Sequence, residues 1–297
     1  VRWTDLNEYR PTEVTEAQFK CHAVFNNRVY IGNIRQPIEV GSSTVKTFPD
    51  RIISSPVNLD GKAQADTFPA GLKMDIAASD GDKITALEGF GDRLLVFKAK
   101  SVYVVNVSVY KDEYLETQFA DMGVQSQSQV TATEYGVVWI NSSGCFLYNE
   151  GQPKNLIDDK LNTKARFITG SMAWDAQISN VPVVAYMPRI DKLIVSLGVD
   201  GGTNDCGLYD FKKESWSFGG GVLGNWDYER SNFVTNQVGD MYFCQNTGGT
   251  PTVFVWNDGS QSHNEFELLF KDFDAGQPNV RKKFYKAYLQ FRASRET

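Results

Sequence analysis

Six basic residues lie close together near the end of the chain and form its sharpest concentration of one charge. They are Arg281, Lys282, Lys283, Lys286, Arg292 and Arg295. Guanidinium and ammonium groups bind carboxylates and phosphates through charge-assisted hydrogen bonds, and cations bind nucleic-acid backbones. The cluster therefore predicts an interface with an acidic protein surface or with DNA. The alternative is a solvated edge strand whose lysines block unwanted pairing.

Three pairs of acidic residues have spacings that can support hydrolysis or cation binding. They are Asp80/Asp82, Asp158/Asp159 and Asp200/Asp205. Paired carboxylates act as acid and base in glycosidases, but the S-x-D-x-G-x-T-W boxes of sialidase propellers do not occur here. The segment "DGGTND" at Asp200–Asp205 offers oxygen ligands for calcium without the EF-hand spacing. We interpret the pairs as solvated turns and leave open whether Asp200–Asp205 binds a cation.

Two further features resemble binding or catalytic motifs. The segment "GGGVLG" at Gly219–Gly224 matches G-x-G-x-x-G, but a dinucleotide site needs a helix directly after it, and "NWDYERSNFV" lacks a helical pattern. A flexible loop is the preferred interpretation. The histidines, His22 in a predicted strand and His263 in a polar loop, lack the convergent partners that metal or acid–base sites need. We therefore predict no cofactor, no metal site and no catalytic residue.

Charge and composition restrict the class of protein. The chain has 297 residues, 41% of them hydrophobic and 13% aromatic, and a formal net charge of -6. An acidic chain is not a general binder of phosphate backbones, although it can line a channel through which DNA slides. No run approaches the length of a transmembrane helix. The start, "VRWTDLNEYR", is no signal peptide and lacks Met, so we expect a fragment of a longer protein.

The four cysteines lie far apart in the sequence, at Cys21, Cys145, Cys206 and Cys244. Because no C-x-x-C pair occurs, a thiol-ligated metal or a redox motif is not indicated. We predict reduced cysteines that pack as small hydrophobic residues. This fits assembly in a reducing cytoplasm.

One unit of short strands and tight turns recurs along the chain. Its copies begin at Cys21, Ile84, Val130, Pro182 and Arg230, which are 63, 46, 52 and 48 residues apart. Most copies contain a polar turn between two strands, namely "FNNR", "FGDR", "RIDK" or "QVGD". Asn, Asp and Gly tolerate the positive φ that hairpins need. A third strand follows, often aromatic.

A repeat of three or four antiparallel strands every 40–50 residues is typical of a β-propeller blade. A β-sandwich is the alternative, but the regular repeat favours the propeller. We therefore predict an all-β fold, a β-propeller of three- to four-stranded antiparallel blades with a C-terminal β segment. Residues 1–20 would end a preceding blade, 21–262 would form the blades, and 263–297 would close the ring or begin a second β domain. Pro11–Lys20 and Asn155–Phe167 are predicted short helices.

Alternation within the strands predicts which side chains form the core. The expected core residues are Leu94, Val96, Val102, Val104, Val137, Trp139, Leu193, Val195, Tyr242 and Val253. Trp174, Trp216 and Trp226 could stack on sugars, but packing inside or between blades is the preferred interpretation.

Three segments resemble virion structural proteins of short-tailed bacteriophages. They are "DGDKITALEGFGDRLLVFKAKSVYVVNV" from Asp80, "YGVVWINSSGCFLYNEGQPKNL" from Tyr135 and "KDFDAGQPNVRKKFYKAYLQFR" from Lys271. The first two lie within Asp80–Leu156 and the third spans Lys271–Arg292. The family is that of tail hub and nozzle proteins, which includes packaged-DNA stabilisation proteins.

The resemblance implies a non-enzymatic virion protein, a β-propeller that assembles in the host cytoplasm as a ring, often a hexamer, below the portal. The ring surrounds the DNA channel and helps retain or release the genome. Its partners would be its own copies, the portal or adaptor, other tail proteins, and DNA passing without sequence-specific binding; no membrane is involved. The basic cluster would then face a neighbouring subunit or an acidic connector protein. A receptor- or glycan-binding propeller at the tail tip is the alternative, and a glycan-cleaving propeller is the third possibility.

Overall fold

The computed structural model describes residues 18–37, 44–57, 68–78, 80–158, 174–178, 181–196, 206–219, 233–247, 250–256, 281 and 283. Contacts divide the chain into two units, Val1–Trp256 and Asn257–Thr297. All described strands belong to the first unit, and only Arg281 and Lys283 are described in the second. The predicted limits at residues 20 and 262 therefore stay predictions, except that the first strand already begins at Gln18.

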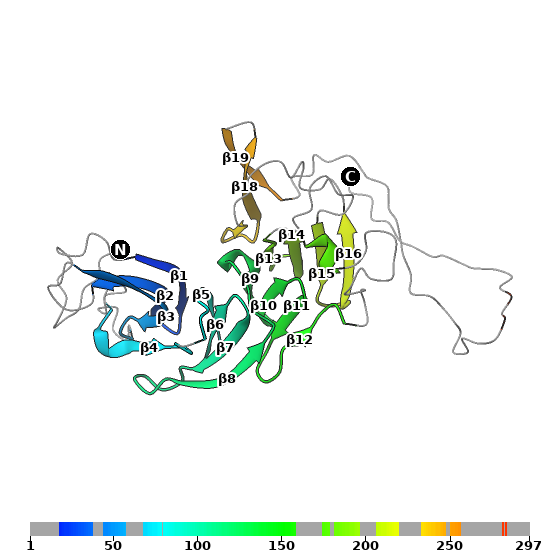
Figure 1. The fold of residues 1–297 in the computed structure, drawn as a ribbon. Helices are drawn as coiled ribbons and strands as arrows, with labels where there is room; N and C mark the ends of the chain where they lie inside the picture. Colours follow the sequence, from blue (N-terminus) through cyan, green and yellow to red (C-terminus); the bar gives the residue numbers. More distant parts are fainter. Residues whose placement is uncertain are drawn as a thin grey trace. The chain divides into compact units, whose positions relative to one another are not determined.

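Five antiparallel sheets follow one another along the first unit as the blades of a β-propeller (Figure 1). The first sheet contains β1 (Gln18–Phe25), β2 (Arg28–Pro37), β3 (Val45–Ser54) and β4 (Lys73–Asp75). The second contains β5 (Ile84–Phe90), β6 (Arg93–Lys98), β7 (Ser101–Asn106) and β8 (Tyr114–Ala120). The third contains β9 (Val130–Thr133), β10 (Gly136–Asn141), β11 (Gly144–Tyr148) and β12 (Lys154–Asn155). The fourth contains β13 (Val183–Met187), β14 (Lys192–Ser196), β15 (Cys206–Asp210) and β16 (Ser215–Gly219). The fifth has three described strands, β17 (Val234–Thr235), β18 (Met241–Thr247) and β19 (Thr250–Val255).

In each sheet, neighbours in sequence are neighbours in space. The predicted all-β propeller of three- to four-stranded blades is therefore confirmed, and each of the five repeat units contains one sheet. The turns follow the predicted chemistry. Asn26 and Asn27 join β1 to β2 with φ of 49° and 56°, and Asp191 precedes β14 with φ of 56°, the left-handed values that Asn and Asp tolerate.

Helices are few and short. The described ones are the 3-10 turns η2 (Ala70–Leu72) and η3 (Gln127–Gln129) and the single-turn helix α1 (Trp174–Gln177). In the described part of the chain, no helix has the length and apolar character needed to cross a membrane.

The prediction of two short helices is wrong for those residues of the two segments that the structure describes as strands. Gln18–Lys20 belong to β1, where Phe19 pairs with Ile34, and Asn155 lies in β12 and pairs with Phe146. An adjacent strand supplies backbone partners that a weak local helical preference cannot outweigh. Leu156, Ile157 and Asp158 form a turn, and the rest of both segments, Pro11–Ala17 and residues 159–167, lies outside the described residues.

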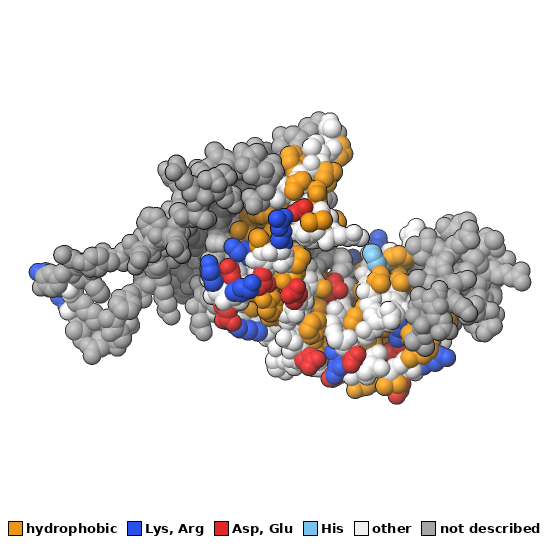
Figure 2. Space-filling view, turned by 180° about the vertical axis from the view of Figure 1, so that it is seen from behind, with side chains coloured by type: hydrophobic (Ala, Val, Ile, Leu, Met, Phe, Trp, Pro, Cys, Tyr) orange, Lys and Arg blue, Asp and Glu red, His pale blue; other side chains and the backbone are white. Residues whose placement is uncertain are grey.

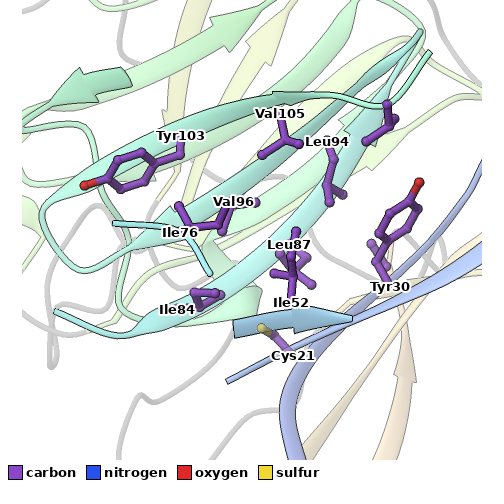
Figure 3. Packing of buried hydrophobic residues seen from close by; sticks show 12 residues of the cluster. Cys21, Tyr30, Ile52, Ile76, Ile84, Leu87, Leu94, Val96, Tyr103 and Val105 are labelled. Atoms are coloured by element: carbon purple, nitrogen blue, oxygen red, sulfur yellow. The ribbon is translucent and has the colours of Figure 1, made fainter. Parts of the chain in front are cut away.

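The core lies between successive sheets, and a buried strand such as β6 contributes alternate residues to two layers of it. In the second sheet, Leu94 and Val96 pack with Tyr30 and Ile52 of the first sheet (Figure 3). The alternate residues of the same strand belong to another cluster. Leu95 and Phe97 pack with Val137 and Trp139 of the third sheet. Strand β6 is therefore buried on both faces.

Eight of the ten predicted core residues are fully buried: Leu94, Val96, Val102, Val104, Val137, Trp139, Leu193 and Val195. The two in the fifth sheet are wrong. Tyr242 is half-buried, whereas its neighbours Met241 and Phe243 are buried, so the inward face differs by one residue. Val253 is 67% exposed, and the other residues of β19 are exposed as well.

Candidate functional site

A polar hollow of about 520 Å³ lies among loops that leave the second, third and fourth sheets. The β6–β7 turn contributes Lys100, and the segment after β8 contributes Asp121 and Gln125. Ser142 and Ser143 come from the turn between β10 and β11. Because all of these side chains lie in turns at strand ends, the rigid sheets fix the position of the hollow.

Two amide side chains hold the walls of this hollow in place. Asn141 Nδ2 donates to the carbonyl oxygen of Gly123 at 2.9 Å. The buried Gln129 accepts a hydrogen bond from the Gln125 backbone N–H at 2.7 Å and donates to the carbonyl oxygen of Ile140 at 2.8 Å. Both amides therefore tie the loop after β8 to β10, and Gln129 also makes a hydrogen bond within that loop.

The chemistry of the lining suits binding of a small polar molecule. Hydroxyl and amide groups can both donate and accept, and Val181 and Pro182 add an apolar side. The volume falls in the usual range of small-molecule sites. Lys100 and Asp121 supply one charge of each sign. Sequence reasoning missed this hollow because its lining comes from four separate turns.

A second polar cluster surrounds Lys98, whose side chain is fully buried. Its Nζ lies 2.7 Å from Asp50 Oδ1 and 2.8 and 2.9 Å from the two carboxylate oxygens of Asp80. It also donates to the carbonyl oxygen of Ala77 at 3.2 Å. The hydroxyl of Tyr103 donates to Asp80 Oδ2 at 3.0 Å. Because Asp50 lies in β3 and Lys98 in β6, this cluster joins the first blade to the second.

Asp80 lies in an exposed bend, as the solvated-turn interpretation predicts, but its carboxylate also pairs with the buried Lys98. Burial raises the pKa of its carboxyl group, but hydrogen bonds from Lys98, the Asp82 backbone N–H and Tyr103 together hold that pKa below its usual value. Asp82 behaves as predicted for a turn, because its carboxylate accepts from the backbone N–H groups of Lys83 and Lys100. Burial and the Asp80 carboxylate raise the pKa of Tyr103 to about 12.

A buried arginine joins the same two blades at the opposite end of the strands. Arg28 Nη1 lies 2.6 Å from Glu113 Oε1, in the segment between β7 and β8. The guanidinium also donates to the Ser54 hydroxyl and to the carbonyl oxygen of Ser55, and it lies 5.0 Å from the ring centre of Tyr110. A buried charge is tolerated only when it is paired in this way.

The third and fourth blades meet at a buried carboxylate. Asp191 accepts hydrogen bonds from the hydroxyls of Tyr135 at 2.7 Å and Tyr186 at 3.0 Å, and Lys212 Nζ lies 3.5 Å away. The Tyr135 hydrogen bond is the largest effect that lowers the pKa of Asp191. Tyr135 also stacks on Phe211, with ring centres 4.5 Å apart.

The predicted basic interface falls mostly outside the described residues. Arg281 and Lys283 are described and are exposed. Lys282, Lys286, Arg292 and Arg295 lie outside the described residues, so their gathering at one surface stays a prediction. On the face of the molecule in Figure 2, Lys and Arg side chains lie among Asp and Glu side chains.

The remaining motifs are partly described. Asp158 accepts from Asn155 Nδ2 at 2.9 Å, whereas Asp159 and Asp200–Asp205 lie outside the described residues. The described residues contain no group of three His, Cys, Asp or Glu side chains placed to hold a metal. Gly219 ends β16, and residues 220–224 are not described.

The histidine and tryptophan side chains that are described have ordinary packing environments. His22 is exposed on β1 beside Phe19, and His263 is not described. Trp174 is buried and donates through Nε1 to the carbonyl oxygen of Asn141 at 2.8 Å. Trp216 donates to Leu156 O at 3.0 Å and packs against Trp174. Packing is therefore confirmed for these two tryptophans, and Trp226 lies outside the described residues.

The cysteines pack as predicted. Cys21, Cys145 and Cys206 are buried and Cys244 is partly buried. Burial raises the pKa of the Cys21 thiol to about 12 and raises that of Cys145 as well. Such thiols are poor nucleophiles at neutral pH because the thiolate is the reactive form.

No protein-family model and no curated protein matches the chain. It is similar to the solved structure of YCF48 bound to a D1 peptide, with 11% identity and a TM-score of 0.44 over 84% of this chain and 66% of that chain. It is also similar to the extracellular domain of the hybrid two-component system BT4673 from B. thetaiotaomicron, with 11% identity and a TM-score of 0.46. That match covers 88% of this chain and 34% of the other.

Proposed function

We propose that this chain is a non-enzymatic structural protein of a bacteriophage tail, located in the hub or nozzle. Copies of it form a ring around the DNA channel and help retain or release the genome. The observation that carries the proposal is the resemblance of Asp80–Leu156 to such proteins. That segment forms two consecutive complete blades, β5–β8 and β9–β12, as a relationship to a propeller family requires.

The contacts between blades support a scaffolding role. Buried charged groups at Lys98, Arg28 and Asp191 each join neighbouring sheets. Hydrophobic clusters fill the space between the same sheets. A protein that holds packaged DNA needs blades that stay together, and these contacts resist separation because each buried charge loses its partner if the sheets part.

The net charge supports passage of DNA. Each subunit carries a net charge of -6, so acidic groups facing the inside of a ring repel phosphates. Basic contacts would instead add salt-dependent affinity and slow the DNA. The basic cluster at Arg281–Arg295 is then available to a neighbouring subunit or an acidic connector protein, where complementary charge fixes the register.

The direct test is the position of the protein in virions. Electron microscopy of virions labelled with gold-conjugated antibody against this chain should show label at the tail below the portal. Light scattering by the purified protein should give the mass of a ring. Virions without label, together with a purified protein that stays monomeric at high concentration, would reject the proposal.

The interface is tested by reversing four charges. Replacing Arg281, Lys282, Lys283 and Lys286 by Glu should block incorporation into virions while the subunit stays folded. A matched control replaces four exposed lysines of the blades by Glu: Lys20, Lys46, Lys154 and Lys213. Normal incorporation of the first variant would refute the assembly role. Virions that assemble but leak DNA would show that the cluster retains the genome instead.

The polar hollow favours a second candidate, a glycan-binding propeller at the tail tip. Its hydroxyl and amide groups suit the hydrogen-bonding groups of a sugar. Glycan-array binding that is lost in Ser142→Trp, which fills the hollow, and kept in the exposed control Ser215→Trp would support this candidate. A glycan array on which the native protein gives no signal would reject the glycan-binding candidate.

A further inference from the structure

The ammonium group of Lys98 lies between two carboxylates, those of Asp50 and Asp80, whose side chains are 14% and 29% exposed. The Lys98 side chain is 0% exposed. Its Nζ lies 2.7 Å from Asp50 Oδ1, and both oxygens of Asp80 are within 2.9 Å. An amine, a carboxyl group to receive it and a second carboxyl group to carry protons are the three parts that amide formation requires.

We propose that Lys98 and Asp50 condense to an amide that covalently links the second blade to the first. Asp80 takes a proton from the ammonium group, and the freed Nζ attacks the carboxyl carbon of Asp50. The new N–C bond forms as one C–O bond of Asp50 breaks. Of the three ammonium protons, one stays on the amide nitrogen and two leave with the departing oxygen as water. No other reactant is consumed, and Asp80 ends as the carboxylate it was before.

The contacts decide which aspartate receives the amine. Asp80 is held on several sides, because Oδ2 accepts from the Tyr103 hydroxyl at 3.0 Å and Oδ1 from the Asp82 backbone N–H at 3.0 Å. These hydrogen bonds hold the Asp80 carboxylate in place beside the ammonium group. Asp50 contacts Nζ through one oxygen only. Because the Asp50 side chain makes no further hydrogen bond among the described residues, we assign its carboxyl group as the one that receives the amine.

Proximity and the burial of the Lys98 side chain favour the condensation. Well-oriented groups within one molecule react with effective molarities of about 10⁵–10⁸ M, which opposes the tendency of water to hydrolyse an amide. A buried ammonium and carboxylate also carry a desolvation cost, and the neutral amide removes it. After reaction, the amide N–H can donate to Asp80, so the remaining carboxylate keeps a partner.

The link would join residues that are 48 positions apart in the sequence. It would tie β3 to β6, which belong to neighbouring sheets. The first blade could then not separate from the second without breaking a covalent bond. This inference stands independently of the proposed role in a phage tail.

The test is the intact mass of the full-length purified protein under denaturing conditions. We expect a mass lower than that of the sequence by one water, and a fragment spectrum in which a peptide containing Lys98 is joined to one containing Asp50. Lys98→Arg, which keeps the positive charge, and Asp50→Ala should both have the full mass. Lys100→Arg, a control in the neighbouring turn, should still lose water. Asp80→Ala should lose it several-fold more slowly.

The outcomes separate a covalent link from an ion pair. The full mass in the native protein would overturn the proposal and leave Lys98 as an ion-paired residue. A link to Asp80 would overturn the assignment of the two aspartates. Circular dichroism of Lys98→Arg shows whether that variant folds, and the measurement on the native chain decides the matter without any variant.

Discussion

Replacing Leu94 by Ala tests the packing between the first two blades. Leu94 is 0% exposed and belongs to the cluster that contains Tyr30 of the first sheet and Leu87 of the second (Figure 3). The substitution removes apolar atoms from a place where two sheets meet. Because sheets resist collapse around a deleted side chain, part of the lost volume should remain as a cavity.

The expected loss combines a transfer effect and a cavity effect. Burial of each methylene-sized group contributes about 0.8 kcal/mol, so the deleted groups account for roughly 2 kcal/mol. The residual cavity adds about 24 cal/mol per Å³. The two effects together predict a decrease of about 2–5 kcal/mol in the free energy of unfolding, the range of Leu→Ala changes in cores.

Urea-induced unfolding followed by tryptophan fluorescence measures this loss. With a slope of about 3 kcal/mol per M, a loss near 3 kcal/mol moves the midpoint down by about 1 M. Leu115→Ala is the matched control, since the same atoms are removed from β8 at a residue that is 46% exposed. Its free energy of unfolding should change by less than about 0.5 kcal/mol.

The comparison of the two variants can refute the reasoning. A loss below about 0.5 kcal/mol for Leu94→Ala, as at surface sites, would mean that Leu94 does not face the cluster. An equal loss in both variants would mean that β8 is covered by something that the described residues do not include. The first result would contradict the register of the second blade, and the second would contradict the exposure of β8.

Three further predictions concern buried polar groups. Arg28→Ala should lower the free energy of unfolding by about 3–5 kcal/mol, because Glu113 loses its buried partner, and a loss under 1 kcal/mol by urea unfolding would contradict it. The Cys145 thiol should react with a maleimide only after unfolding, since burial raises its pKa; mass spectrometry of the labelled native protein checks this. The pKa of Asp191 is lowered in the folded state, so its contribution to stability is complete above the unfolded value of about 3.9 and is lost as pH falls through the folded value. Asp191→Asn should therefore flatten the fall in melting temperature at acid pH, and an unchanged fall would reject the assignment.

The repeat and its turns were predictable from sequence because both depend on neighbouring residues. Two asparagines in a row, Asn26 and Asn27, provide positive φ for a hairpin whatever surrounds it. Alternation placed Leu94 and Val96 in the core. Sequence could not show that Leu95 and Phe97 are equally buried, because that depends on a second sheet packing on the other face.

Errors arose where contacts from elsewhere in the chain decide the result. Gln18–Lys20 and Asn155 form strands because β2 and β11 offer them backbone partners. In the fifth sheet, Met241 and Phe243 face inward in place of Tyr242. A shift of one residue exchanges the two faces of a strand, and the apolar residues on both faces of "MYFCQ" gave no means of choosing.

The candidate sites were the least predictable part. No signal in the sequence indicates that Lys98 is buried, because its partners Asp50 and Asp80 lie 48 and 18 positions away. Local sequence therefore determined the strands, the hairpins and the repeat of this propeller. Only the tertiary structure determined which charges are buried together, because the energy of a buried charge depends on partners that folding brings from distant parts of the chain.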